Sequence, residues 1–144
     1  MLDVIDGLVA TCTTALVGLD ATVVEGVPAQ PVATVYGLSV GLGYNDDAPI
    51  TVTDDPIGTG ERSDSLLIVR CIGQVLGAVD ADLAVLRAQA SDMMTRVDAA
   101  IAADMTLGGT AAMSWIGGIQ RFWPARTSEQ AIWTMSFDVH IRVL

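Results

Sequence analysis

Three side chains near the C-terminus, Ser136, Asp138 and His140, are of the types that form a hydrolytic triad. In such a triad the imidazole lies between the nucleophile and the acid, whereas alternate residues of a strand are spaced about 7 Å apart along one face. The order along the chain also puts the carboxylate in the middle. We therefore interpret the group as the polar face of a strand and expect no catalytic residue.

Doubled acids in the first half of the chain could suggest a calcium site, namely Asp46, Asp47, Asp54 and Asp55. A calcium loop of the EF type needs acids at alternate positions, a central glycine and a closing glutamate, and this spacing fails that test. The acids are interpreted as a solvated acidic loop, and no metal is expected.

The cysteines and glycines give no cofactor signal. Cys12 and Cys71 lie in no CxxC motif and near no histidine cluster, which predicts two ordinary buried thiols. Gly41-Leu42-Gly43 and Gly58-Thr59-Gly60 do not follow the strand, turn and helix order of a dinucleotide site. We expect no cofactor.

Charge is unevenly distributed along the 144 residues, which carry a formal net charge of -10 although 51% of them are hydrophobic. All seven basic residues are arginines, so a Walker-type phosphate loop and Schiff-base chemistry are excluded. Residues 1–43 carry -4, residues 44–64 carry -5 and residues 65–144 carry -1. This net negative charge argues against binding of a nucleic-acid phosphate backbone as the main function. Its uneven distribution predicts an acidic face opposite a nearly neutral one.

Hydrophobic periodicity predicts the elements that position these groups. The spacing predicts helices over 2–19 and from Asp80 or Asp82 to about Asp104, and strands over 22–27, 32–42, 65–76, 111–122 and 133–143. Gly117-Gly118 predicts a bulge, and Trp123 to Arg126 a turn. The expected fold is α+β: a mainly antiparallel twisted sheet of four to five strands with two amphipathic helices packed on it.

The strand over 65–76 has apolar residues on both faces. This pattern predicts a central strand covered on both sides, by helices or by another subunit. Residues 1–144 are expected to form one domain, from which an acidic loop or hairpin over 44–64 projects, with Ile50 to Thr53 in the hairpin.

Polar and aromatic residues outside the predicted core are the candidates for an interface or a lumen. Trp123, in the predicted turn, is the candidate interface anchor. The full set is Asp46, Asp47, Asp54, Asp55, Glu61, Arg62, Trp123, Arg126, Asp138, His140 and Arg142. The acidic start of the chain is unlike a signal peptide, and its most apolar stretch is shorter than a membrane span, so we expect a protein made in a cytoplasm, with no membrane partner.

The layout resembles the tail terminator proteins of long-tailed, siphovirus-like bacteriophages. The resemblance spans nearly the whole chain and is carried by an N-terminal helix, a strand pair with a long intervening loop, and a second helix. These lead into the turn Asp104-Met105-Thr106-Leu107-Gly108-Gly109-Thr110, and an alternating final strand over 131–143 closes the chain.

The resemblance implies a structural virion protein of the tail or neck, made in the bacterial host. Such proteins form a ring, hexameric in that family, that caps the tail tube, ends its polymerisation and presents a surface to the head connector or stopper protein. DNA passes through the lumen as cargo, and the family offers no catalytic residue. Two alternatives stay open: another head-tail assembly protein, such as a head-completion or tail-tube subunit, and a small-molecule-binding domain.

Overall fold

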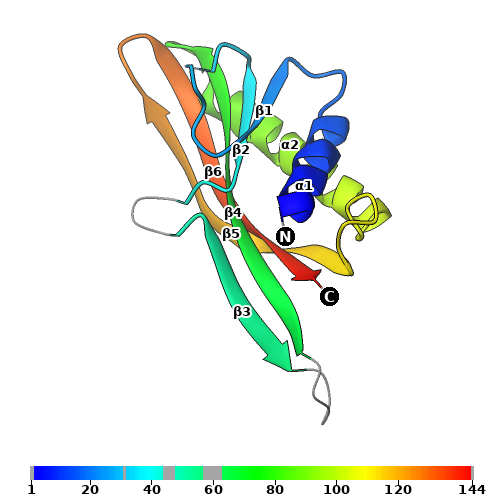
Figure 1. The fold of residues 1–144 in the computed structure, drawn as a ribbon. Helices are drawn as coiled ribbons and strands as arrows, with labels where there is room; N and C mark the ends of the chain where they lie inside the picture. Colours follow the sequence, from blue (N-terminus) through cyan, green and yellow to red (C-terminus); the bar gives the residue numbers. More distant parts are fainter. Residues whose placement is uncertain (1, 31, 44–47, 57–62, 144) are drawn as a thin grey trace.

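The computed structural model describes residues 2–30, 32–43, 48–56 and 63–143, with two helices and six strands among them (Figure 1). The elements in chain order are α1 (Leu2–Ala15), β1 (Ala21–Glu25), β2 (Tyr36–Val40), β3 (Ile50–Pro56), β4 (Ser63–Ala78), α2 (Leu83–Ala103), β5 (Met113–Arg126) and β6 (Gln130–Val143). The α+β class, with two helices on one sheet, is as the sequence predicts.

The strands form one sheet in the order β1-β2-β4-β6-β5, with β3 also paired to β4. β4 pairs antiparallel with β6 over fourteen residues, from Ser65 opposite Val143 to Ala78 opposite Gln130. On its other edge β4 accommodates two strands in succession, β2 along Cys71–Val75 and β3 along Ser63–Val69. Every other described strand therefore pairs either with β4 itself or with a strand that pairs with β4.

The sheet differs from the expectation in two respects. It has six described strands rather than four to five, and it is mixed, because β1 and β2 pair in parallel. The link between β1 and β2 doubles back to the start of β1, where the Asp20 carboxylate accepts from Val35 N at 3.1 Å and the Asp20 carbonyl accepts from Tyr36 N. This double contact sets Ala21 beside Tyr36 and so makes the pairing parallel.

The prediction of a turn at Trp123 to Arg126 is wrong, because these residues are the end of β5. The reversal comes later, where the Thr127 hydroxyl accepts from the backbone N–H groups of Glu129 and Gln130. Pro124 does not end the strand because β5 lies at the edge of the described sheet, where a missing N–H breaks no ladder. The predicted bulge at Gly117-Gly118 is confirmed by a register shift between Ile116 and Gly118.

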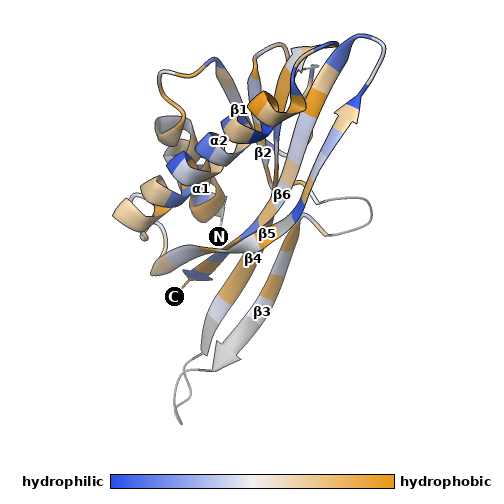
Figure 2. Cartoon of the chain, turned by 180° about the vertical axis from the view of Figure 1, so that it is seen from behind, coloured by the Kyte–Doolittle hydropathy of each residue, from blue (hydrophilic) through white to orange (hydrophobic). Residues whose placement is uncertain are grey.

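Both helices cover the same face of the sheet (Figures 1 and 2). α2 begins at the N-cap Asp82, whose side chain accepts from Ala84 N, and packs its buried residues on β4, β5 and β6. Alternate side chains of the strands pack against the helices. Among them are Leu67, Val69, Phe137 and Val139, which are fully buried. The alternation predicted for β4 and β6 is confirmed, but the described helices cover one face only.

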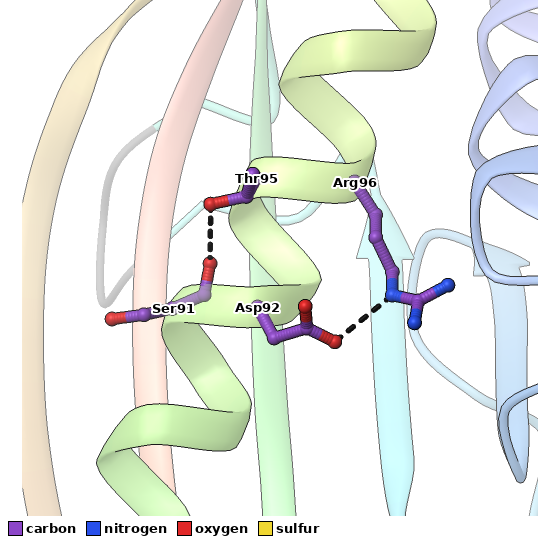
Figure 3. Close-up of polar contacts among 4 residues, drawn as sticks. All are labelled: Ser91, Asp92, Thr95 and Arg96. Carbon is purple, nitrogen blue, oxygen red and sulfur yellow. Dashed lines mark hydrogen bonds and ion pairs between the residues drawn. The ribbon is translucent and has the colours of Figure 1, made fainter.

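The outer side of α2 is polar (Figure 3). The Arg96 Nε atom lies 2.9 Å from the Asp92 carboxylate, one helical turn earlier, and the Thr95 hydroxyl donates to the Ser91 carbonyl. The two charged side chains are about half exposed, so the pair contributes about 0.3–0.5 kcal/mol. This side of the helix layer therefore faces solvent.

The turn after α2 fastens α1 to the rest of the core. Leu107 adopts a left-handed φ of 51° yet is buried, and the left-handed Gly108 and Gly109 follow it. Gly7 of α1 packs against this turn so closely that a Cβ there would lie 2.6 Å from the Leu107 carbonyl oxygen and overlap the Thr110 hydroxyl. The turn thus accepts only a glycine on the facing side of α1.

We predict that Gly7→Ala lowers the free energy of unfolding by about 2 kcal/mol, because the methyl group meets backbone that cannot move aside. Gly73→Ala is the matched control: its methyl would also approach within 3 Å, but toward the flexible ends of Met93 and Met135. Urea unfolding followed by circular dichroism measures both. A smaller loss for Gly7→Ala than for Gly73→Ala would contradict the analysis.

Candidate interaction surfaces

The sheet face opposite the helices, here called the open face, is the largest surface of the described chain that no helix covers. Alternation along each strand and the register between strands assign its residues. They are Leu66, Ile68, Arg70, Ile72, Gln74 and Leu76 on β4, Ile132, Thr134, Ser136, Asp138, His140 and Arg142 on β6, and Trp115, Arg121 and Trp123 on β5. Most are half-buried, and Arg121 is exposed.

Arginine dominates the charge of the open face. It carries Arg70, Arg121 and Arg142 against one carboxylate, Asp138, which lies directly opposite Arg70 in the register. The Arg70 Nη1 atom donates to the Ala48 carbonyl at 2.9 Å and to the Thr51 hydroxyl at 2.8 Å, which fixes the start of β3. The sequence prediction included Arg142 and Asp138 but missed Arg70 and Arg121, although the alternation of β4 was a signal for the first.

His140 is packed rather than poised for catalysis. Its ring centroid lies 5.5 Å from that of Trp115, and a Cβ at Gly117 would overlap the imidazole. Ser136, Asp138 and His140 are alternate residues of one straight strand, as the polar-face interpretation expects. The Ser136 hydroxyl is buried without a hydrogen-bond partner among the described residues, and neither neighbouring polar residue takes it up.

The other predicted site residues divide into three groups. Trp123 is half-buried on the open face, and Arg126 instead donates from Nη1 to the Val79 carbonyl and from Nη2 to the Ala81 carbonyl, so that it holds the link between β4 and α2. Asp54 and Asp55 are residues of β3. The remaining four, Asp46, Asp47, Glu61 and Arg62, lie outside the described residues.

β3 and the start of β4 form the arm, defined as Ile50–Pro56 with Ser63 and Asp64, the two residues of β4 that precede its pairing with β6 (Figure 1). The arm continues the sheet past the end of the helix layer, and Val52 on its helix side is 48% exposed. The pairing runs residue by residue over seven positions without a register shift. The arm is therefore a regular extension of the sheet.

The described surface carries several shallow grooves, of which two are mainly apolar and two have polar and apolar linings alike. One of about 500 Å³ lies beside the start of α2, lined by Tyr36, Ala84, Val85, Ala88, Gln89 and Asp92. Another of about 330 Å³ lies between α1 and the turn after α2. The second groove includes Thr11, Thr14 and Asp104 in its lining. No group of three metal-ligating side chains occurs among the described residues. None of the described helices is long and apolar enough to cross a membrane.

Asp104 organises the turn on which the family resemblance rests. Its Oδ1 atom accepts from the Thr106 hydroxyl at 2.6 Å and from Thr106 N at 3.1 Å, and Oδ2 accepts from Gly108 N at 2.8 Å. The Thr106 hydroxyl and the Gly108 N–H favour the ionised carboxylate and so lower the pKa of Asp104 below its usual 3.8. This residue was predicted only as a helix end, and its capping role was missed.

Comparisons with known proteins do not assign a function to this chain. No protein-family model and no curated protein matches it. A chain of a solved structure titled "Virion of native gene transfer agent (GTA) particle" matches with a TM-score of 0.31 and 18% identity, over 94% of this chain and 84% of that one. At that score and identity the likeness defines neither fold nor function.

We predict that neither cysteine reacts with a thiol reagent in the folded protein. Cys12 and Cys71 are fully buried, and burial raises the pKa of Cys12 to about 12 and that of Cys71 further still. Since the thiolate is the reactive form, titration with a chromogenic disulfide should find no thiol in buffer and both thiols in guanidinium. Rapid labelling of either residue in buffer would contradict the burial.

We predict that Asp104→Asn lowers the melting temperature at pH 7. Both carboxylate oxygens of Asp104 accept hydrogen bonds, whereas the side-chain amide of asparagine has only one oxygen that can accept. A carboxyl whose native pKa is depressed stabilises the fold above its unfolded pKa, near 3.8, and loses this effect as the pH falls through the native value. Melts from pH 7 down to about 2.5 should therefore show the gap to wild type closing. Asp98→Asn removes the same charge from α2, and a gap equally wide at every pH would contradict the prediction.

Proposed function

We propose that this protein is a structural tail terminator of a long-tailed bacteriophage. In this proposal it forms a ring, hexameric as in the family, which caps the tail tube, ends its polymerisation and joins the head connector or stopper protein. It acts in the virion without an enzymatic step, a cofactor or a metal. The support from the sequence is the family layout. The described chain has four strands, β1 to β4, between its helices, where that layout has a strand pair with a long loop, and two C-terminal strands follow α2.

The observation that carries the proposal is the open face. A sheet face exposed to water normally alternates to polar residues, yet this one carries Ile68, Ile72, Leu76 and Ile132 among its polar side chains. All four are half-buried within one chain, and a row of apolar side chains on a sheet face that no described helix covers is typical of a surface that another chain covers. A subunit of a ring needs such a surface, whereas an isolated enzyme or binding domain does not.

Charge supports the same proposal. Nine of the ten units of net negative charge fall in residues 1–64, which include the arm. Like charges repel phosphates, so a ring with acidic parts toward its lumen would let DNA pass without holding it.

Two alternatives remain, each with its own signature. A head-completion or tail-tube subunit would use the same kind of open face, but a tube subunit polymerises into filaments, whereas a terminator stops at a closed ring. A small-molecule-binding domain would stay monomeric and need a pocket with convergent polar groups. The grooves of about 500 and 330 Å³ are mainly apolar, whereas one of about 400 Å³, beside residues 32–35 and 76–78, has a lining of polar and apolar groups alike.

The proposed function predicts that the protein shortens tail tubes. Added to polymerising tube subunits of its phage, it should bind at tube ends and reduce the mean tube length as its concentration rises, while tubes grown without it continue to extend. Electron microscopy of negatively stained tubes measures the lengths. The heat-denatured protein is the control, and tubes of unchanged length would refute the terminator role.

A second prediction concerns the acids. Replacing Asp46, Asp47, Asp54 and Asp55 together by Asn should change the melting temperature little, because the sequence predicts a solvated acidic loop and substitutions at solvated positions are usually within about 0.5 kcal/mol. The same variant should be impaired in tube capping or in DNA passage, measured by tube length and by infectivity of complemented particles. A large fall in melting temperature would show instead that these acids stabilise the fold.

A further inference from the structure

The arginines of the open face and the acids of the arm are opposite charges on two surfaces of one chain. We propose that the acidic arm of one copy of this protein lies across the open face of the next copy. The inference rests on the ring in the proposed function and names the two surfaces that make its subunit contact.

Within one chain this contact is excluded by the topology. β3 pairs with β4 in register from Ile50 opposite Val69 to Pro56 opposite Ser63, so the arm is part of the same sheet whose face is open. A sheet segment that continues its neighbours edge to edge cannot also lie on their face. The arm can reach an open face only on another molecule.

Charge complementarity selects the arm as the occupant. The arm carries three acids, Asp54 and Asp55 in β3 and Asp64 at the start of β4, and no basic residue. The open face carries three arginines and one aspartate, and Arg121 is exposed at its β5 side. The two surfaces therefore attract each other, although the whole chain carries -10.

The other side of the molecule does not offer the arm an equivalent site. Around the helix layer the exposed charged residues are Asp3, Asp6, Asp80, Asp82, Asp92, Asp98 and Asp104 against Arg87 and Arg96. An acidic arm is repelled there. Among the described surfaces, the open face combines apolar side chains with an excess of arginine.

The contact is head-to-tail, because it joins two different surfaces of identical chains. Such heterologous contacts give a closed ring when the rotation between copies closes, and a filament when it does not. Each copy then uses its own arm once and its own open face once. This defines what a variant lacking one surface can still do.

Site-directed cross-linking tests the contact even where association is weak. One variant carries a cysteine on the arm, Val52→Cys or, on the opposite face of β3, Thr53→Cys, and a second carries Thr134→Cys on the open face. Thr95→Cys, exposed on α2, is the matched control. Cys12 and Cys71 are fully buried, so a short bismaleimide should join only the introduced thiols.

We expect an arm cysteine to join Thr134→Cys at least about tenfold faster than Thr95→Cys, because the contact raises the local concentration of the two thiols. Arg121→Glu should abolish this preference, as should Asp54→Arg with Asp55→Arg, and combining the two changes should restore it. Arg87→Glu, the same charge reversal on α2, should leave it intact. Circular dichroism verifies that each variant is folded.

Three outcomes are decisive. Equal rates to Thr134→Cys and Thr95→Cys, or no cross-link to either from both arm positions, overturn the inference. If that result accompanies normal shortening of tail tubes, the proposed function stands and its subunit contact lies elsewhere. A clear preference for Thr134→Cys without tube shortening supports the contact and refutes the terminator role.

Discussion

The pairing of β4 on both of its edges is the constraint on which the rest of the structure depends. Fourteen consecutive residues pair with β6, while β2 and β3 share the opposite edge. Because both edges of the strand are engaged, its side chains alternate strictly, and Leu67, Val69, Cys71 and Val75 are fully buried beneath the helices. The same alternation sends the other half of the strand to the open face.

The described helices cover only one face of this long strand. α2 contacts β4, β5 and β6, and α1 packs on α2, β1 and β2, on the same face of the sheet (Figure 1). Close packing rather than charge holds them there: Gly7 leaves room for the turn after α2, and Asp104 shapes that turn. On the opposite face, the described residues include no covering helix (Figures 1 and 2).

The sequence allowed the elements with a strong period to be predicted, and the errors have physical causes. The alternation of polar and apolar residues was sufficient to predict β6, and the capping aspartate with its apolar stripe was sufficient to predict α2. The prediction of a turn at Trp123 to Arg126 was wrong because Pro124 is typical of turns. In an edge strand such as β5, a proline without an N–H costs no hydrogen bond of the sheet. The parallel pairing of β1 with β2 depends on Asp20 reaching Val35, a contact across fifteen residues that no local pattern encodes. Of the candidate site, the polar residues of β6 were found. Arg70 was missed although the alternation of β4 signalled its face, whereas Arg121 needed the register, because β5 contains two register shifts.

The composition, apolar and yet strongly acidic, follows from this division of surfaces. The core side of the sheet takes the apolar residues of β4 and β6, and the carboxylates are exposed around the helices, where each stays hydrated at little cost. The open face carries three arginines, Arg70, Arg121 and Arg142, and one carboxylate among its described residues, Asp138. This separation of charge between the two sides of one sheet is what the proposed head-to-tail contact between identical chains would use.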